Sequence, residues 1–313
     1  MLSVLVMISS CSLIDDDLSV CGTDVKIVYF TRPQNNIADE IATVLPEQTV
    51  QPVADSLRAF LEPVFTPQIH DLHLSFYTSP EDKEYIRTRE QVNATQKDYT
   101  YYMPQGDYVH PVVANSDGNG VVLYRGGQSW YNEQLRQTAD DTVASFETGV
   151  YTARPVLNIS DTEQTVQVPL YMTCSAVALV IDSATVGKDS IRACVKGMAS
   201  GFDIADSVYL YMPQAVNAMR CIADLCFATV CFPSADVLDS EGTYYTVVVH
   251  VTNPDGTVTE TLLTMHRPLN ADRLKIIRCK LKDDGEVEPQ KNNEVGVSVT
   301  LDWKKGGDFE INE

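Results

Sequence analysis

The chain has 313 residues with a hydrophobic content of 44%, which is enough to bury a full core, and its length favours two domains. It carries 43 acidic against 23 basic residues, so its formal net charge is −20. Surfaces that bind nucleic acid or anionic lipid by charge need clustered cations, but the nearest candidates here are two lysine pairs flanked by acids. The composition therefore argues against both kinds of partner.

The first eleven residues suggest an export signal. An apolar run from Leu2 to Ile8 ends in Ser9-Ser10-Cys11, which resembles a bacterial lipobox, where the signal peptide is cut before a cysteine that is then acylated. The run is shorter than the roughly 20 apolar residues that span a bilayer. We predict a signal peptide at residues 1–10 that lacks the usual basic start, lipidation at Cys11, and an acidic tether at 11–24. The alternative is a buried N-terminal strand with a chance cysteine.

The first half is predicted to mix strands with one helix. VKIVYF at residues 25–30 is rich in β-branched and aromatic residues and predicts a strand. Apolar residues at helical spacing predict a helix at 51–64, and a further strand is expected at 70–77. A polar helical segment is expected at about 131–141.

Four tyrosines lie around a Pro/Gly turn in a predicted strand-turn-strand at residues 99–108. They could form a platform on which sugar rings stack. Alternatively they pack across a strand pair, which we favour. These tyrosines are Tyr99, Tyr101, Tyr102 and Tyr108.

From Thr148 onward the pattern is of strands almost throughout. Residues 166–172 alternate with period two, and Asn253-Pro254-Asp255-Gly256 predicts a hairpin turn within 243–266. Closing strands are expected at 275–281 and 295–303. We predict an all-β protein with minor α content, divided at a polar stretch into an N-terminal β-sandwich domain at 25–160 and a C-terminal one at 161–313.

The eight cysteines show neither a CxxC motif nor zinc spacing with histidine. Most lie in apolar surroundings, where a free cysteine acts as a small hydrophobe. We expect most of them to be reduced core thiols, and one disulfide among Cys221, Cys226 and Cys231 stays open.

No motif for catalysis, nucleotide binding or calcium binding is found. His70 and His73 are three apart, and a strand would point them to opposite faces, which makes a poor metal pair. We therefore predict a protein without enzymatic activity, with no catalytic residue, no metal ligand and no cofactor.

Several segments, weak singly, together resemble the Bacteroidales fimbrial anchor lipoproteins of the FimB/Mfa type. They are the lipobox with the acidic segment Ile14–Cys21, the strand-turn-strand and loop Tyr102–Gly120, the alternating VQVPLYM followed by SAVALVIDS, and the closing Asp302-Trp303. Two departures are the absence of a tryptophan after the strand that Tyr108 begins and a tail of ten residues after Trp303.

The resemblance implies two tandem transthyretin-like β-sandwich domains, a lipid anchor in the outer membrane and a surface-exposed scaffold role in a fimbrium. Its partners would be stalk or accessory pilin subunits bound by β-strand addition. We expect strand 25–30 to stay in its own sandwich, because cutting after it would detach the anchor. Attachment is then expected near the C-terminus, at Trp303, Phe309 and Ile311. The alternative function is a surface glycan-binding lipoprotein of a polysaccharide-uptake system.

Overall fold

The computed structural model describes residues 22–32, 37–46, 51–66, 68–79, 83–91, 98–125, 129–138, 141–182, 190–221, 225–234, 238–240 and 242–290. Most of them lie in β-strands and two α-helices accompany the strands, so the predicted all-β class with minor α content is confirmed. Neither described helix has the length and apolar character needed to cross a membrane. The predictions for the signal peptide, Cys11, the strand at 295–303, Trp303, Phe309 and Ile311 lie outside the described residues.

The N-terminal half is built on one long, continuous set of paired strands in the order β11-β5-β2-β6-β10-β12-β1-β4, with β3 also paired to β2. The predicted strands at 25–30 and 70–77 and the strand-turn-strand at 99–108 are all present. The bounds are β1 (Gly22–Thr31), β2 (Asp71–Ser79), β3 (Lys83–Gln91), β4 (Asp98–Pro104), β5 (Gly106–Val109), β6 (Val112–Ala114), β10 (Tyr151–Ala153), β11 (Val156–Ile159) and β12 (Gln164–Met172).

Strand β1 is held on both sides. It pairs in parallel with β12 and antiparallel with β4. Val25, Ile27 and Tyr29 are at most 1% exposed, because alternate residues of a strand point to the same face and this face meets the core. Strand β1 thus lies within the sheet of its own half, and its retention during assembly stays a prediction.

The C-terminal half is a sandwich of two five-stranded sheets, ordered β18-β19-β13-β22-β23 and β21-β20-β14-β17-β9. The predicted hairpin at 243–266 forms β20 and β21, with Gly256 at φ 83° in the turn, a left-handed conformation that suits glycine. The bounds are β9 (Thr142–Val143), β13 (Ser175–Asp182), β14 (Ile191–Lys196), β17 (Ala215–Asn217), β18 (Met219–Arg220), β19 (Cys226–Cys231), β20 (Tyr245–Thr252), β21 (Val258–Met265), β22 (Leu274–Leu281) and β23 (Val287–Pro289).

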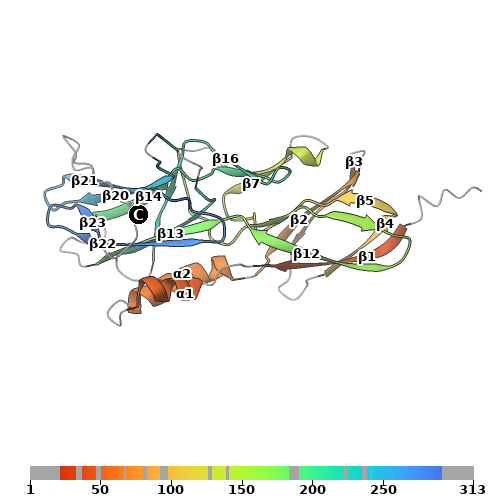
Figure 1. Ribbon diagram of the computed structural model, residues 1–313, viewed down its shortest axis with the longest axis horizontal. Helices are drawn as coiled ribbons and strands as arrows, with labels where there is room; N and C mark the ends of the chain where they lie inside the picture. The colour runs from red at the N-terminus through yellow and green to blue at the C-terminus, as the bar shows by residue number, and fades with distance from the viewer. Residues whose placement is uncertain are drawn as a thin grey trace, which may run out of the picture.

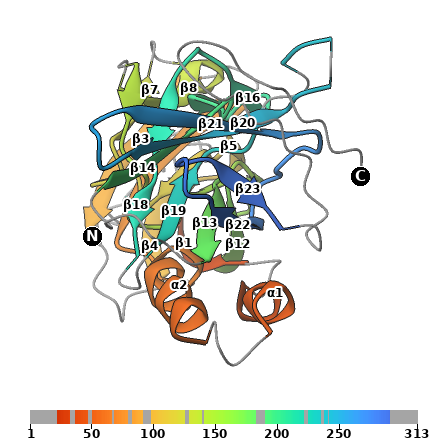
Figure 2. The ribbon, with the colours of Figure 1, turned by 90° about the vertical axis from the view of Figure 1, so that its left-hand side faces the viewer.

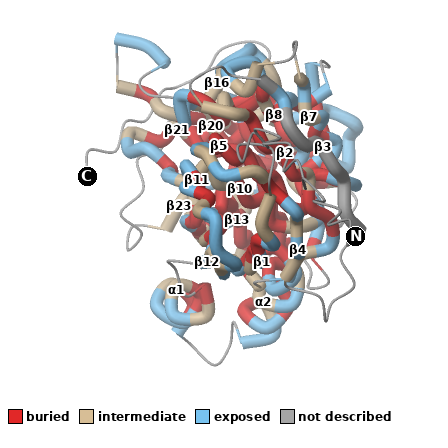
Figure 3. The backbone as a smooth tube through the Cα atoms, turned by 90° about the vertical axis from the view of Figure 1, so that its right-hand side faces the viewer, coloured by how far each residue is buried: buried red, intermediate tan, exposed pale blue. Residues whose placement is uncertain are grey.

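Helices α1 (Ile37–Val44) and α2 (Gln51–Phe65) follow β1 in the chain but lie against the C-terminal half, along the outer face of the sheet that contains β13 (Figures 1 and 2). Helix α2 contacts β19, and helix α1 contacts β22. The backbone N–H of Leu274, which starts β22, donates to Glu40 Oε2 of α1 at 3.2 Å. The predicted helix at 51–64 is confirmed as α2. Buried residues face the sheets, whereas the outer sides of both helices are exposed (Figure 3).

A four-stranded sheet joins the two halves. It is ordered β16-β15-β8-β7 and combines β7 (Val121–Arg125) and β8 (Glu133–Gln137) with β15 (Gly201–Asp203) and β16 (Val208–Leu210). The expected helix at 131–141 is wrong: a short 3-10 turn, η3 (Trp130–Asn132), leads into β8 instead. Backbone pairing of β8 with β7 and β15 outweighs the local propensity, and alternate residues from Glu133 to Gln137 are buried.

Strand β12 belongs to the sheet of the N-terminal half, although it follows the polar stretch at which the sequence analysis divides the chain. The pairings change from one half to the other at Thr173 and Cys174, between β12 and β13. The division into separately folding domains at 25–160 and 161–313 stays a prediction.

Candidate functional site

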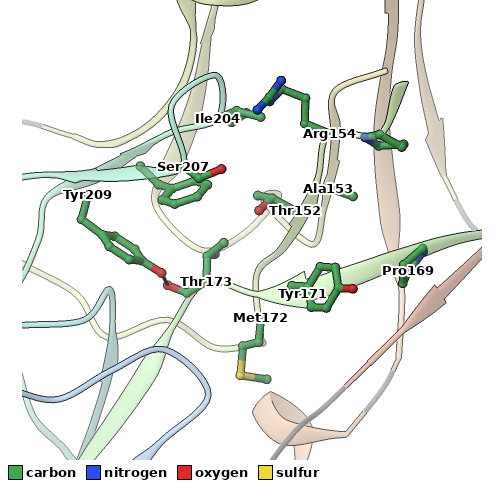
Figure 4. Close-up of a pocket in the computed structure, with 12 residues that line it drawn as sticks. Thr152, Ala153, Arg154, Pro169, Tyr171, Met172, Thr173, Ile204, Ser207 and Tyr209 are labelled. Atoms are coloured by element: carbon green, nitrogen blue, oxygen red, sulfur yellow. Dashed lines mark hydrogen bonds between the residues drawn. The ribbon is translucent and has the colours of Figure 1, made fainter. Parts of the chain in front are cut away.

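A groove lies where the two halves meet (Figure 4). It has a volume of about 400 Å³ and opens between the ends of β10 and β12 on one side and the β15–β16 turn on the other. It is lined by Thr152, Ala153, Arg154, Pro155, Pro169, Tyr171, Met172, Thr173, Phe202, Ile204, Ser207 and Tyr209.

Aromatic packing fixes one wall of the groove. The ring centroids of Phe202 and Tyr209 are 4.9 Å apart, and the Tyr209 hydroxyl donates to the carbonyl oxygen of Thr173 at 3.1 Å. Burial raises the pKa of the Tyr209 hydroxyl, so this group stays protonated as a donor. Tyr171, from β12, is 41% exposed and offers its ring to an incoming group.

Arg154 supplies the cationic group of the groove. Its guanidinium lies over the Trp130 ring, 4.9 Å from the centroid, a geometry suited to a cation–π interaction. Its Nε is shielded from solvent and has no hydrogen-bond partner among the described residues. The groove can therefore hold an apolar or ring-shaped group and donate to a carbonyl or hydroxyl oxygen. None of its lining residues carries a carboxylate, an imidazole or a thiol.

The tyrosines of the strand-turn-strand do not share one exposed face. Tyr99 and Tyr101 are half-buried and pack against Tyr29 and Phe76 respectively. Tyr108 is buried and its hydroxyl donates to the Pro104 carbonyl oxygen at 3.0 Å. Packing is therefore confirmed for these three, whereas the fourth, Tyr102, is 62% exposed.

His110 is a core residue of the N-terminal half. Its Nε2 lies 2.9 Å from the Tyr29 hydroxyl and its Nδ1 lies 2.7 Å from the Ser75 carbonyl oxygen. Because a carbonyl oxygen can only accept, Nδ1 carries the proton and Nε2 accepts from Tyr29. Complete burial lowers the pKa of His110 to about 4, so the ring is neutral at pH 7 and serves structure.

The sheets in the described part of the chain end in strands that are paired on one side only, and two of these edge strands, β4 and β23, bear on strand addition at the two ends of the chain. Within that part, β4 pairs with β1 alone and β23 pairs with β22 alone. Such edges present backbone donors and acceptors to a further strand. The chain continues from β23 into residues 291–313, which hold the predicted partner-binding residues Trp303, Phe309 and Ile311.

Asp71, His73 and Asp117 form a cluster that the sequence analysis did not single out. The spacing of Asp71 and His73 could have indicated part of this cluster, since residues two apart on a strand share a face. The pair His70 and His73, which are three apart, does not reveal it. Asp117 lies in a turn 44 positions further along the sequence, and nothing local predicts its approach.

No protein-family model matches the chain, and no curated protein matches its sequence significantly. Solved structures do match in fold. A Bacteroides thetaiotaomicron protein described as a candidate polysaccharide-binding protein is 11% identical with a TM-score of 0.53, and the match covers 94% of this chain and 99% of that one. A candidate adhesin from Bacteroides ovatus is 10% identical with a TM-score of 0.53, covering 90% and 95%.

The fimbrial anchor protein Mfa2 from Porphyromonas gingivalis is 11% identical with a TM-score of 0.51, and the match covers 93% of this chain and 100% of that one. These matches extend over almost the whole of each chain, so the similarity includes both halves and their connection. The chain therefore has the β-sandwich fold of these Bacteroidales fimbrial and adhesin proteins, and the resemblance inferred from the sequence is confirmed at the level of fold.

Proposed function

We propose that the chain is a non-catalytic, lipid-anchored subunit of a fimbrium, exposed at the surface of the outer membrane. The observation that carries this proposal is the placement of β1 and β23 in opposite halves of an elongated molecule (Figure 1). An anchor needs its membrane attachment and its partner attachment far apart. β1 follows the predicted lipid site at Cys11 after residues 12–21, and β23 leads to the predicted partner-binding residues.

The position of β1 in its sheet supports a membrane attachment at the N-terminal half. It is paired on both sides, and its buried face belongs to the core of the N-terminal half. Releasing it for exchange would break two ladders and expose Val25, Ile27 and Tyr29. The N-terminal half is thus suited to hold the lipid tether, and strand addition to a pilin subunit falls to the C-terminal residues.

The membrane half of the proposal is tested with Cys11→Ala. We expect this variant to lose fatty-acid label and to leave the outer-membrane fraction. Stable attachment to a membrane needs more than one acyl chain, and the predicted acylation depends on this cysteine. Cys21→Ala is the matched control and should keep the label. Label and outer-membrane fractionation that survive in Cys11→Ala would contradict lipidation at this residue.

The filament half is tested by deleting residues 304–313. We expect folding and lipidation to be kept while fimbriae are released into the medium, because Phe309 and Ile311 alternate with acids as a short pairing strand requires. The double variant Phe309→Ser, Ile311→Ser keeps the length and should act alike. Fimbriae retained in both would rule out this segment as the connector.

Glycan binding in a polysaccharide-uptake system is a second candidate, and the groove is the observation that favours it. Tyr171 offers a ring, and the guanidinium of Arg154 supplies a cationic group to the lining. A pull-down of the native protein separates the two functions. Co-purified pilin subunits would support the anchor, whereas an outer-membrane transporter, together with glycan binding lost in Tyr171→Ala, would support uptake.

A further inference from the structure

We propose that Asp71, His73 and Asp117 form a binding site for a divalent transition-metal cation, for which Zn²⁺ is the appropriate probe. One ligand atom from each residue lies within 4.8 Å of the other two. The site is a feature of the fold itself, and it does not depend on a role in a fimbrium.

The separations of these atoms suit a bridging cation. His73 Nε2 lies 3.8 Å from Asp71 Oδ1 and 3.6 Å from Asp117 Oδ1. Neither distance is that of a hydrogen bond, which needs about 2.7–3.2 Å. Ligands bound tetrahedrally at about 2.0–2.1 Å from zinc lie roughly 3.3 Å apart, so each of the two distances from His73 would have to shorten by only a few tenths of an ångström to suit an ion.

Strand geometry and burial prepare two of the ligands. Asp71 and His73 are on the same face of β2, and their side chains are only 3% and 13% exposed. A divalent cation at the site would interact favourably with both carboxylates, because its charge is large and the surroundings of Asp71 are shielded from solvent.

The third ligand sits on a turn that is itself held firmly. Asn115, at φ 60°, accepts from the backbone N–H of His70 at 2.7 Å and donates to the carbonyl oxygens of Gln68 and Gly149. Asn119 donates to the carbonyl oxygen of Asn115 at 2.7 Å and accepts from the backbone N–H of Glu147 at the same distance. These bonds place Asp117 beside β2 before any ion binds, so little ordering is required on binding.

The donor set selects the class of cation. One imidazole nitrogen and two carboxylate oxygens suit zinc and its neighbours, whereas calcium and magnesium prefer oxygen ligands alone. Asp117 is 36% exposed, so the site opens to solvent on that side. Water or a group from another molecule can complete the coordination there.

A bound cation would fasten β2 to the turn that leads into β7. Because β7 belongs to the sheet that joins the two halves, the ion would stiffen the region where the N-terminal half enters this sheet. Binding to the folded state alone stabilises it, so the melting temperature should rise with Zn²⁺ concentration.

The test is calorimetric titration of Zn²⁺ into the tag-free, full-length protein after EDTA treatment. We expect one ion per chain, and at least tenfold weaker binding in both Asp117→Asn and His73→Gln. Asp117→Asn is the primary variant because its side chain is partly exposed. His70→Gln and Asp107→Asn are matched controls outside the cluster and should bind as the wild type does.

Spectroscopy supplies an independent readout. Co²⁺ in place of Zn²⁺ should give a visible absorption band that is lost in His73→Gln, because the band reports coordination by the protein. Circular dichroism of the EDTA-treated variants should match the wild type. The absence of saturable binding to the wild type, or equal affinity in both cluster variants, would overturn the proposal, and the second result would point to thiols as the ligands.

Discussion

Strands β1 and β13 are both paired on two sides, yet they are buried in different ways. β1 alternates, with Val25, Ile27 and Tyr29 buried and Asp24 and Lys26 exposed. β13 is buried continuously from Ser175 to Ile181. The difference reflects what lies against the outer face of each strand.

The outer face of β13 is covered by helices from the other half of the chain. Val177, Leu179 and Ile181 belong to the core between the two C-terminal sheets. Ala176 and Ala178 belong instead to the core cluster that contains the residues of α1 and α2. The C-terminal half is therefore completed by residues 37–65, whereas the N-terminal half contributes them. The two halves therefore depend on each other unequally.

The largest effect is expected when the two halves are produced separately, as fragments 25–160 and 161–313. We expect the second fragment to show no cooperative melting, because it lacks both helices and its β12 loses β1 as a partner. Calorimetry and circular dichroism measure the transition. Cooperative melting of fragment 161–313 would contradict this dependence and support the predicted domain division.

A single substitution in the helical cover should have a smaller effect. Leu57→Ala, at a side chain of α2 that is 0% exposed, should lower the free energy of unfolding by about 2–5 kcal/mol. Glu62→Ala, on the exposed side of the same helix, should change it by less than about 0.5 kcal/mol. Urea titration at pH 7 measures both, and a Leu57→Ala variant as stable as Glu62→Ala would show that the cover contributes little.

Acid should weaken the N-terminal half through His110. Burial lowers its pKa to about 4 from an ordinary value of 6.5, so folding favours the neutral ring. This stabilisation is complete above pH 6.5 and is lost as the pH falls through 4, a change of about 3 kcal/mol. His110→Gln should lose this part of the pH dependence. Urea titrations at pH 7 and pH 4 should give a smaller difference in the free energy of unfolding for the variant than for the wild type. An equal difference would show that the buried His110 ring does not cause this part of the pH dependence.

Oxidation should act on the C-terminal half, and with the smallest effect. The backbone N–H of Cys221 donates to the carbonyl oxygen of Cys226 at 2.8 Å, and a hydrogen bond between the thiols raises the pKa of Cys226. With oxidised glutathione, the two thiols would give up two electrons and two protons to form a disulfide worth about 2 kcal/mol. Mass spectrometry after alkylation detects it, with Cys221→Ser as control. Both thiols alkylating after oxidation would refute the pairing.

Local patterns predicted the elements whose burial is decided locally. The alternation of β1, the hairpin of β20 and β21 and the apolar stripe of α2 each lie in a short window of sequence. Local patterns did not predict strand β8, because its pairing with β15 joins residues more than sixty positions apart. The pairing of β1 with β12 is similarly distant, which is why the boundary between the halves lies beyond residue 160.

The candidate site was less predictable than the fold. The groove depends on the meeting of β12 with the β15–β16 turn, and Asp117 approaches Asp71 only because Asn115 and Asn119 hold the turn in place. Cys174, Cys226 and Cys231 are buried thiols, as their apolar surroundings predicted, whereas Cys194 is only half-buried. The predicted attachment residues at both ends of the chain stay predictions.

The parallel pairing of β1 with β12 determines how the molecule would respond to a pull. In a tethered protein under tension, force enters through Gly22 and runs along the axis of β1. The seven register pairs from Val25 to Thr31 then resist sliding together, and the ladder with β4 shares the load on the other side. A strand loaded along its length cannot unzip one bond at a time, so the first strand of this fold is placed to withstand traction.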